Sequence, residues 1–572
     1  MDAAPDVPAQ DVPAQDGLRE AAAAWLAQDP DPETRAELRA LLDADDGPAL
    51  AGRFGARLEF GTAGLRGELG AGPNRMNRVT VMRAAAGLAA RIRQDHPAGA
   101  AVAIGYDARH GSRRFALDTA AVLTGAGLAA RLFPRPVPTP VLAHYVGASG
   151  AVVAGVMVTA SHNPPRDNGY KVYWGDGAQI VPPLDAEISA AIDAVGRVDG
   201  LPLGTGWDLL GDAEIDRYLD AVAGLRLGAA RDVSVAYTPL HGVGRDVLLR
   251  AFGRAGFRAP AVVPEQAEPD PDFPTVAFPN PEEPGAMDLV LGLAEAAGAD
   301  LVIANDPDAD RCAVAVPGPD GWRTLTGDEV GGLLAEQVLA HTAGDDRLIA
   351  STIVSSSLPA AIARAHGVRF AESLTGFKWI MKAGRPGDRL VFGYEEALGY
   401  SVGDDRGLPV RDKDGVGAAL AIAALAATAA RDGRTLGDLL DDQARRYGLH
   451  ATSQLSFRVA DPALITGAVA RLRADPPAEI AGRTVASFDD LAEGAGGLPP
   501  TDGLRFRLAA GPSGGTARVV IRPSGTEPKL KCYLEVVLPV GDGDRDIAAV
   551  RARGAAELDA LRTALSAALG LG

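Results

Sequence analysis

One pattern recurs along most of this 572-residue chain and limits what it can fold into. A short apolar run ends in a polar or glycine-rich turn, and a segment with helical periodicity follows, as in residues 101–131, 232–256 and 347–367. Strands that alternate with helices predict mixed α/β domains with largely parallel pairing. In such sheets ligands bind beyond the carboxyl ends of the strands, which is where the polar turns of this chain lie.

The C-terminal part of the chain has a different pattern. LSFRV, ARVVIRPSG and KLKCYLEVV are typical of strands, and a long helix is expected from about Asp544 to Leu569, so this part is predicted to be α+β. The N-terminus contains a tandem DVPAQ repeat rich in Pro and Asp, which is typical of a disordered tail. The predicted divisions are a tail (1–16), three α/β domains (17–205, 206–320 and 321–445) and a C-terminal α+β domain (446–572).

Composition excludes several classes of protein. Two cysteines, Cys312 and Cys532, are too few for a disulfide framework, although a single bridge between them stays open. We find no signal peptide and no run of about 18 apolar residues, and we expect the Ala-rich AALAIAALAATAA to be a buried helix. The net charge of −18 disfavours nucleic acid and anionic membranes as partners. We therefore expect a cytoplasmic protein whose anionic small substrate would need a local group of basic residues.

The motif DPDADR places Asp306, Asp308 and Asp310 within five residues, directly after the apolar run LVIA. Three carboxylates so close together repel one another unless a cation neutralises them. Because oxygen ligands suit Mg²⁺, the motif predicts a magnesium site, and it lacks the glycine and glutamate positions of an EF-hand loop. The alternative is a solvated acidic turn.

The motif TASHNP follows another apolar run and places Ser161 at a turn that an electrophile can approach. No GxSxG motif is present, so acyl transfer has little support. A serine combined with a carboxylate metal site favours phosphoryl transfer, in which His162 would be a hydrogen-bond donor or a proton shuttle. The alternative is a structural turn stabilised by the Ser and Asn side chains.

Two further motifs could bind the two ends of a phosphorylated sugar. In RPSGTEPKLK, backbone N–H groups and hydroxyls can hold a phosphate, with Arg522 and Lys529 adding positive charge. In GYEEALGY, Glu395 and Glu396 would alternate sides of an extended segment, so that one of them can accept hydrogen bonds from sugar hydroxyls. The alternatives are an exposed hairpin loop and a solvated carboxylate pair.

Together these motifs resemble those of the α-D-phosphohexomutase superfamily, which includes phosphoglucomutases and phosphomannomutases. The resemblance covers about residues 50 to 540, with four signatures in the family's order. FGTAGLRG, TPLHGVG and LTGFKW look most like the long branch that also includes phosphopentomutases. The resemblance implies an α/β fold with three related mixed domains and a smaller C-terminal α+β domain around a central cleft.

The resemblance also implies roles for individual residues. Ser161 would carry the phosphoryl group and would share Mg²⁺ with Asp306, Asp308 and Asp310. Arg66 would lie beside the phosphoserine, and Lys171 would be the general acid/base, which requires that neighbouring positive charge lower its pKa. The residues expected to bind the sugar are Arg311, Gly376, Lys378, Glu395 and Ala397. Those expected to bind the distal phosphate are Arg522, Ser524, Gly525, Thr526 and Lys529.

The chain departs from the family pattern at two positions. Ala397 stands where members that recognise hexose O3 and O4 often have Ser, and Tyr400 stands where many mannose-tolerant members have His. A second acid/base residue is therefore unassigned. We expect a mutase that interconverts glucose or mannose 1- and 6-phosphates through a sugar 1,6-bisphosphate, as a monomer or homodimer. The alternatives are a phosphopentomutase, a sugar-bisphosphate synthase, a Mg²⁺-dependent sugar phosphatase and a non-catalytic sugar-phosphate sensor.

Overall fold

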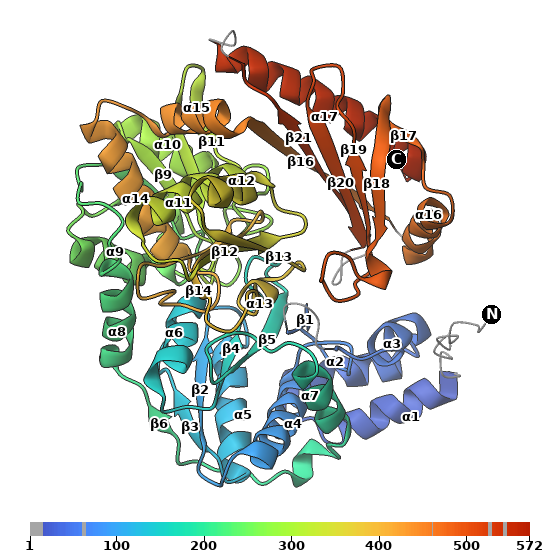
Figure 1. Ribbon diagram of the computed structural model, residues 1–572. Coiled ribbons are helices and arrows are strands. Elements are labelled where there is room, and N and C mark those ends of the chain that lie inside the picture. Colours follow the sequence, from blue (N-terminus) through green and yellow to red (C-terminus); the bar gives the residue numbers. More distant parts are fainter. Residues whose placement is uncertain (1–14, 60–63, 460, 524–528, 542–545, 572) are drawn as a thin grey trace.

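Four β-sheets, each with its own helices, follow one another along the chain in the computed structural model (Figure 1). The structure describes residues 15–59, 64–459, 461–523, 529–541 and 546–571. Most of the predicted disordered tail lies outside this part, but Gln15 and Asp16 already belong to α1 (Gln15–Leu26). The four sheets confirm the predicted fold class, whereas the domain limits stay a prediction.

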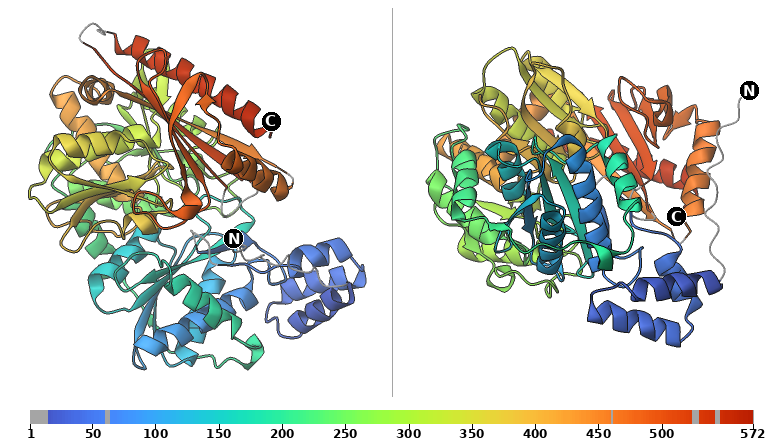
Figure 2. Two further views of the ribbon diagram at one scale, coloured as in Figure 1. Left: turned by 45° about the vertical axis from the view of Figure 1, so that its right-hand side comes forward. Right: turned by 90° about the horizontal axis from the view of Figure 1, so that it is seen from below.

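The first sheet has mixed pairing, with its central strands parallel and one edge antiparallel. Its strand order is β1 (Leu65–Glu68), β5 (Asp167–Trp174), β4 (Ala154–Val158), β2 (Ala101–Tyr106), β3 (Ala129–Leu132) and β6 (Asp208–Leu209). Its helices are α4 (Arg78–Asp95), α5 (Ser112–Gly125), α6 (Thr139–Ser149) and α7 (Leu184–Asp193). Before it, α1, α2 (Pro32–Asp43) and α3 (Gly47–Phe54) project from one side of the molecule (Figure 2).

The second and third sheets repeat this mixed plan. The second has the order β11 (Gly321–Thr324), β10 (Ala313–Gly318), β9 (Leu301–Ala304), β7 (Val235–Thr238) and β8 (Ala261–Val262), with α8 (Asp212–Ala223), α9 (Gly244–Ala255) and α10 (Asp288–Ala297). The third has β13 (Arg369–Ser373), β12 (Arg347–Thr352), β14 (Arg389–Glu395) and β15 (Gly399–Val402), with α11 (Gly327–His341), α12 (Leu358–Ala365), α13 (Phe377–Ile380), α14 (Gly415–Arg431) and α15 (Leu436–Tyr447).

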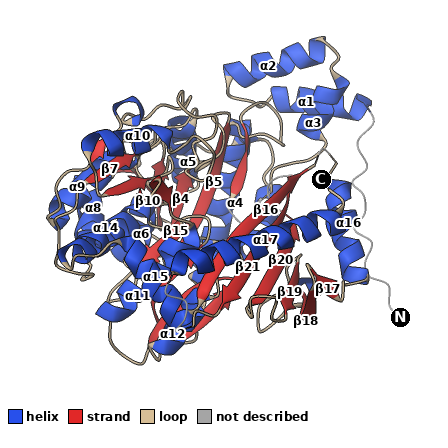
Figure 3. Ribbon diagram, turned by 90° about the horizontal axis from the view of Figure 1, so that it is seen from above, coloured by secondary structure: helices blue, strands red, loops and turns tan. Residues whose placement is uncertain are grey.

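The C-terminal sheet is antiparallel throughout, as its different sequence pattern predicts. Its order is β16 (Leu449–Arg458), β21 (Lys529–Leu538), β20 (Thr516–Pro523), β19 (Leu504–Leu508), β18 (Arg483–Asp490) and β17 (Glu479–Ile480). Helix α17 (Ile547–Leu569) lies along this sheet, and α16 (Pro462–Ala474) contacts its inner strands β20 and β21 (Figure 3).

One local arrangement recurs in the first three sheets and positions the site. A strand with a parallel neighbour turns back into an antiparallel strand: β4 into β5, β9 into β10, and β14 into β15. The turns carry TASHNP, DPDADR and the middle of GYEEALGY. Because the three domains repeat one plan, three of the predicted motifs lie at equivalent turns of three different sheets.

The Ala-rich segment forms α14, which is mostly buried, as expected. Cys312 and Cys532 are both free and buried, so they form no bridge. Within the described ranges, no single helix combines the length and apolar character needed to cross a membrane. Helices α14 and α15 satisfy that test only as a pair bent by 91°.

Candidate active site

The three aspartates of DPDADR form a compact, fully buried cluster in the turn between β9 and β10. One carboxylate oxygen of each lies within 4.8 Å of the others. Oδ1 of Asp308 and Oδ1 of Asp310 are buried and have no hydrogen-bond partner within the described part of the chain. Unpaired buried carboxylate oxygens are costly, and a divalent cation with oxygen ligands satisfies them, so the residues present fit a Mg²⁺ site.

Ser161 reaches this cluster from the first sheet. Its hydroxyl donates to Oδ2 of Asp306 at 2.7 Å, although the two residues lie 145 positions apart. The serine is 3% exposed and has a φ of 52°, which is rare for a residue with a side chain. Its own N–H donates to Oγ1 of Thr159 at 2.8 Å and helps hold this backbone conformation. Strained backbone of this kind is frequent at functional sites.

Lys171, on β5, lies at the other side of the aspartate cluster. Its Nζ donates to Asp308 at 2.8 Å and to Asp310 at 2.9 Å. Although burial favours the neutral amine, these two carboxylates raise the pKa of Lys171. Burial likewise opposes ionisation of Asp308, but Lys171 lowers the pKa of that carboxyl. The nearest charges to Lys171 within the described chain are negative, so the lowered pKa expected from the sequence depends on the positive charge of a bound Mg²⁺ and stays a prediction.

Burial and the neighbouring carboxylates Asp310 and Asp308 raise the pKa of Asp306 well above its ordinary value. Thr139, at the start of α6, donates from Oγ1 to Asp308 at 2.6 Å. The aspartates belong to the second domain, and Lys171 and Thr139 bind them from the first. A proton or a cation is needed to keep the three carboxylates together in this buried turn.

Lys413 is a second buried lysine at the cluster, and it belongs to none of the motifs predicted from the sequence. Its Nζ lies 3.4 Å from Oδ2 of Asp310 and 4.0 Å from Oε1 of Glu395. It thus connects the aspartate cluster to the predicted sugar-binding glutamate at the end of β14. A usable signal was the dense charge of RDKDG, which begins at Arg411 directly before the apolar helix α14.

Two arginines and His162 surround Ser161. Nη1 of Arg66 donates to Oδ1 of Asn163 at 2.8 Å, and Nη1 of Arg311 donates to the carbonyl of Ala397 at 2.8 Å. Nδ1 of His162 lies 3.1 Å from Oγ of Ser161. Burial and the charges of Arg311 and Arg66 lower the pKa of His162 well below its ordinary value, so the ring is neutral at pH 7.

Arg109 was also missed, and it fixes the backbone of the serine turn. Its guanidinium donates to the carbonyls of Ser161, Asn163, Pro164 and Asp167, at 2.5 to 3.2 Å. The residue follows β2 in DARHG, where the sequence analysis did not single it out. Its neighbour His110 instead contacts the exposed Asp272 at 2.8 Å.

The predicted sugar-binding residues of the third domain contact different parts of the molecule. Glu395 approaches Lys413, and Ala397 binds Arg311 through its carbonyl. Gly376 has a φ of 113° and begins the short helix α13. Lys378, on α13, lies 3.9 Å from Asp185 of α7, and burial lowers its pKa. Tyr400, which replaces the family histidine, is buried and donates from its hydroxyl to the carbonyl of Gly327 at 3.3 Å.

The predicted phosphate-binding loop is only partly described. Ser524, Gly525 and Thr526 lie outside the described residues, so their expected role is unchanged. Arg522 lines a small pocket with Thr375 and Trp379 of the third domain and with Leu491, Thr501 and Asp502 of the C-terminal domain. Lys529 begins β21 opposite Arg458.

Comparison with known proteins gives matches along nearly the whole chain. Four family descriptions match in order: Phosphoglucomutase/phosphomannomutase alpha/beta/alpha domain I (residues 57–198), domain II (216–319), domain III (326–447) and the C-terminal domain (464–561).

Individual relatives carry different names. A probable phosphomannomutase of Haemophilus influenzae is 44% identical over 80% of this chain and 93% of its own length. A phosphopentomutase of Mus musculus is 35% identical over 92% of this chain and 91% of its own length. A glucose 1,6-bisphosphate synthase of Homo sapiens is 35% identical over 90% of this chain and 89% of its own length. The crystal structure of a putative phosphomannomutase from Thermus thermophilus is similar with a TM-score of 0.66 at 25% identity, covering 88% of this chain and 99% of that one.

Proposed function

This chain belongs to the phosphoglucomutase/phosphomannomutase family, and we propose that it is a phosphosugar mutase that works through a phosphoserine at Ser161. The substrates proposed first are the 1- and 6-phosphates of glucose or mannose. The observation that carries the proposal is the 2.7 Å contact between the Ser161 hydroxyl and the buried aspartate cluster. A nucleophilic serine beside a carboxylate cation site is the arrangement that phosphoryl transfer needs.

Asp306, Asp308 and Asp310 would hold Mg²⁺ together with an oxygen of the phosphorylated serine. The cation would neutralise negative charge on the transferred group. Arg66 and Arg311 add two half-buried guanidinium groups close to the same turn. Side chains of this chain would supply the nucleophile and the proton transfers.

In the proposed reaction, the bond between phosphorus and Oγ of Ser161 breaks while a bond to a free sugar hydroxyl forms. The hydroxyl loses its proton, and Ser161 keeps the bonding electrons as an alkoxide that must be protonated or otherwise stabilised. The product of this step is a sugar 1,6-bisphosphate. When the bisphosphate has turned round, the second transfer runs in reverse and returns a phosphoryl group to Ser161.

Three side chains lie where they can exchange these protons. His162 is neutral and its Nδ1 lies 3.1 Å from the serine oxygen. Lys171, on β5, and Lys413, in the segment before α14, both contact Asp310. We assign Lys171 to the acid/base role that the family resemblance implies, and Lys413 is our candidate for the second, unassigned group.

The runner-up is a phosphopentomutase, which a specific observation favours. Ala397 offers no side-chain hydroxyl, and its carbonyl is already bound by Arg311. One contact to a hexose hydroxyl is therefore missing from the turn that follows Glu395. The relatives named phosphopentomutase cover nearly the full length of this chain as well.

The test is ³¹P NMR of the purified protein with Mg²⁺ and a trace of glucose 1,6-bisphosphate. Glucose, mannose and ribose 1-phosphates are offered in parallel tubes. A 6-phosphate or 5-phosphate signal supports the mutase and ranks its sugars, whereas inorganic phosphate alone identifies a phosphatase.

Two serine variants make the test specific. Ser161→Ala should abolish turnover with the fold intact, and Ser456→Ala, which changes an exposed serine on β16, should behave as wild type. Turnover near the wild-type rate in Ser161→Ala would contradict the assignment of Ser161 as the phosphoserine.

A further inference from the structure

The loop that follows β12, residues 353–357, supports the turn that carries the predicted sugar-binding glutamate. Oγ of Ser355 donates to Oε2 of Glu396 at 3.0 Å, and Oγ1 of Thr352 lies 3.3 Å from the same oxygen. The N–H of Glu396 in turn donates to Oγ of Ser355 at 3.2 Å. Glu396 is therefore held from two directions, and Glu395 is its neighbour in the chain.

In the other two sheets, equivalent loops also bind the turn that belongs to the site. In the first sheet, Arg109 follows β2 and binds the carbonyls of the Ser161 turn. In the second, the N–H of Val243, in the segment after β7, donates to the carbonyl of Pro307 at 2.8 Å. In each sheet the supporting loop leaves the strand that pairs in parallel with the strand leading into the site turn. Each of the three domains therefore has a supporting loop at the equivalent position, and the residues through which it binds the site turn differ.

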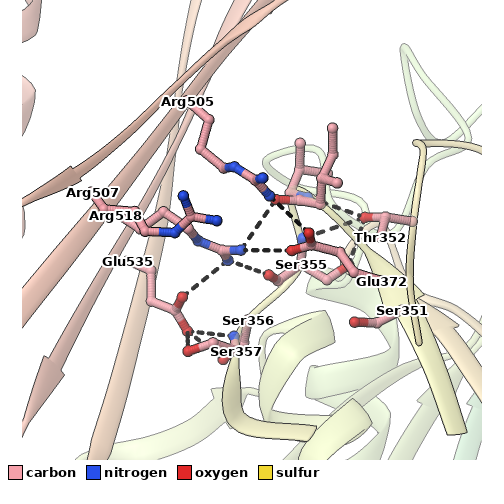
Figure 4. Close-up of polar contacts among 12 residues, drawn as sticks. Ser351, Thr352, Ser355, Ser356, Ser357, Glu372, Arg505, Arg507, Arg518 and Glu535 are labelled. Atoms are coloured by element: carbon pink, nitrogen blue, oxygen red, sulfur yellow. Dashed lines mark hydrogen bonds and ion pairs between the residues drawn. The ribbon is translucent and has the colours of Figure 1, made fainter. Parts of the chain in front are cut away.

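In the third sheet the supporting loop is itself held by the C-terminal sheet (Figure 4). Arg518, on β20, donates to the carbonyl of Ile353 at 3.2 Å and to that of Ser355. Oε1 of Glu535, on β21, accepts from Oγ of Ser356 at 2.7 Å and from the N–H of Ser357 at 2.6 Å. The hydroxyl of Ser357 donates to the same Glu535 oxygen at 3.1 Å, so two side chains of one domain bind five groups in a loop of another.

Arg518 and Glu535 face each other across adjacent strands. Nη2 of Arg518 lies 2.9 Å from Oε2 of Glu535, and their side chains are only 15% and 4% exposed. Although burial favours the neutral acid, Arg518 and His450 lower the pKa of Glu535 to about 2. The carboxylate is thus charged at neutral pH, and loss of Arg518 would leave it with much less compensation.

The same face of these two strands leads to the predicted phosphate-binding loop. Side chains four residues apart on a strand share a face, so Arg518 lies on the face of Arg522, and Glu535 on that of Lys531. Arg522 and Lys531 are themselves opposite each other, next to residues 524–528. Between the two polar pairs, Val520 and Tyr533 pack against Ile353, Val354 and Leu374 of the third domain, and Leu491 completes this apolar contact.

We propose that Arg518 is a positioning residue for the sugar phosphate. By holding residues 353–357, it keeps the end of β14, which carries Glu395, and the turn after it at a fixed separation from the strands that lead to the phosphate-binding loop. Arg518 touches no reacting atom, and it acts through Ser355 and Glu396. The inference rests on the proposed function, because it takes Glu395 and Arg522 as the residues that bind the two ends of one substrate.

The first test measures the structure directly, by amide hydrogen exchange of the full chain. Arg518→Gln should speed exchange at least about tenfold in peptides that cover 353–358 and 395–399. Arg507→Gln is the matched control, since Arg507 is on the neighbouring strand β19 and pairs at 2.8 Å with Asp489 while 48% exposed. It should leave both peptides unchanged. Wild-type exchange at 395–399 in Arg518→Gln would overturn the inference.

The second test is kinetic and uses the phosphosugar that the wild type turns over fastest. Arg518→Gln should raise KM about tenfold while kcat falls less than about threefold, because substrate binding is weakened more than the chemical step. Arg518→Lys keeps the charge opposite Glu535 and should restore part of the loss. Ser355→Ala removes the contact to Glu396 without touching the C-terminal sheet, and it should raise KM in the same way.

The outcomes separate this inference from the proposed function. A lower kcat with unchanged KM in Arg518→Gln and Ser355→Ala would indicate a structural role only and would overturn it. If the wild type turns over no phosphosugar, the proposed function fails. The positioning of the 395–399 turn is then still decided by hydrogen exchange.

Discussion

Lys171 illustrates at the residue scale how the aspartate cluster is kept intact. Its ammonium group lies within 2.9 Å of Asp308 and Asp310, so it partly neutralises carboxylates that would otherwise repel one another. Lys171→Met should therefore destabilise the metal-free protein by about 3 kcal/mol. Added Mg²⁺ should restore more stability in this variant than in the wild type, because the cation and the lysine neutralise the same two carboxylates.

Thermal unfolding over a series of Mg²⁺ concentrations measures this effect. Lys382→Met is the control, since Lys382 forms a comparable pair with Asp176 at the surface, where such a pair contributes less than about 1 kcal/mol. Equal Mg²⁺ responses of Lys171→Met and wild type would contradict the explanation.

Glu396 gives a prediction about pH. Burial, together with the charges of Glu395 and Asp328, raises its pKa from 4.5 to about 7, while Lys531 opposes the shift. A raised pKa means that the stabilising contribution is complete below the unfolded pKa, near 4.5, and is lost as the pH rises through about 7. Glu396→Gln mimics the protonated side chain. The free energy of unfolding of this variant, minus that of the wild type, should increase by up to about 3 kcal/mol between about pH 4.5 and about pH 8.

Urea denaturation of both proteins at several pH values measures the difference directly. Other groups that titrate in this range are common to both proteins and cancel in the comparison. A difference that stays constant with pH would show that folding does not raise the pKa of Glu396.

At the scale of elements, the loops that support the site turns should matter as much as the turns themselves. Arg109→Met would leave four carbonyls of the serine turn without their donor and should cost about 3 kcal/mol or more. It should also reduce phosphoryl transfer, because the φ of 52° at Ser161 is held by this surrounding structure. Arg114→Met is matched, since Arg114 is 55% exposed and lies 3.6 Å from Asp118. Urea denaturation and turnover should be near wild type for this control and reduced for Arg109→Met.

These supporting residues also mark the limit of what the sequence could predict. Ser161 and the three aspartates were identifiable because each motif carries its chemistry within a few residues, directly after a buried strand. Arg109 and Arg518 act on backbone carbonyls 52 to 165 residues away, and no local pattern encodes such a partner. Lys171 was identifiable by its motif, but the direction of its pKa shift depends on two aspartates of another sheet.

At the scale of the whole molecule, the distribution of apolar cores predicts how the protein unfolds. One continuous cluster of buried side chains extends from Ala101 to Leu440 and joins the first three sheets. A separate cluster, from Ala444 to Leu569, belongs almost entirely to the C-terminal domain. The apolar contact between these two parts includes only six buried residues within the described ranges. We therefore expect two unfolding transitions in calorimetry, one for the first three domains and one for the C-terminal domain.

Mg²⁺ should separate the two transitions further, because all three aspartates and Ser161 lie in the first three domains. A ligand that binds only the native state stabilises that part, by about 2.7 kcal/mol at one hundred times its dissociation constant. Calorimetry with and without Mg²⁺ should show the midpoint of the larger transition rising while that of the C-terminal domain stays in place. Asp308→Asn should remove the rise. A single transition that moves as a whole would mean that the contact made by Arg518, Glu535 and their apolar neighbours joins all four domains into one cooperative unit.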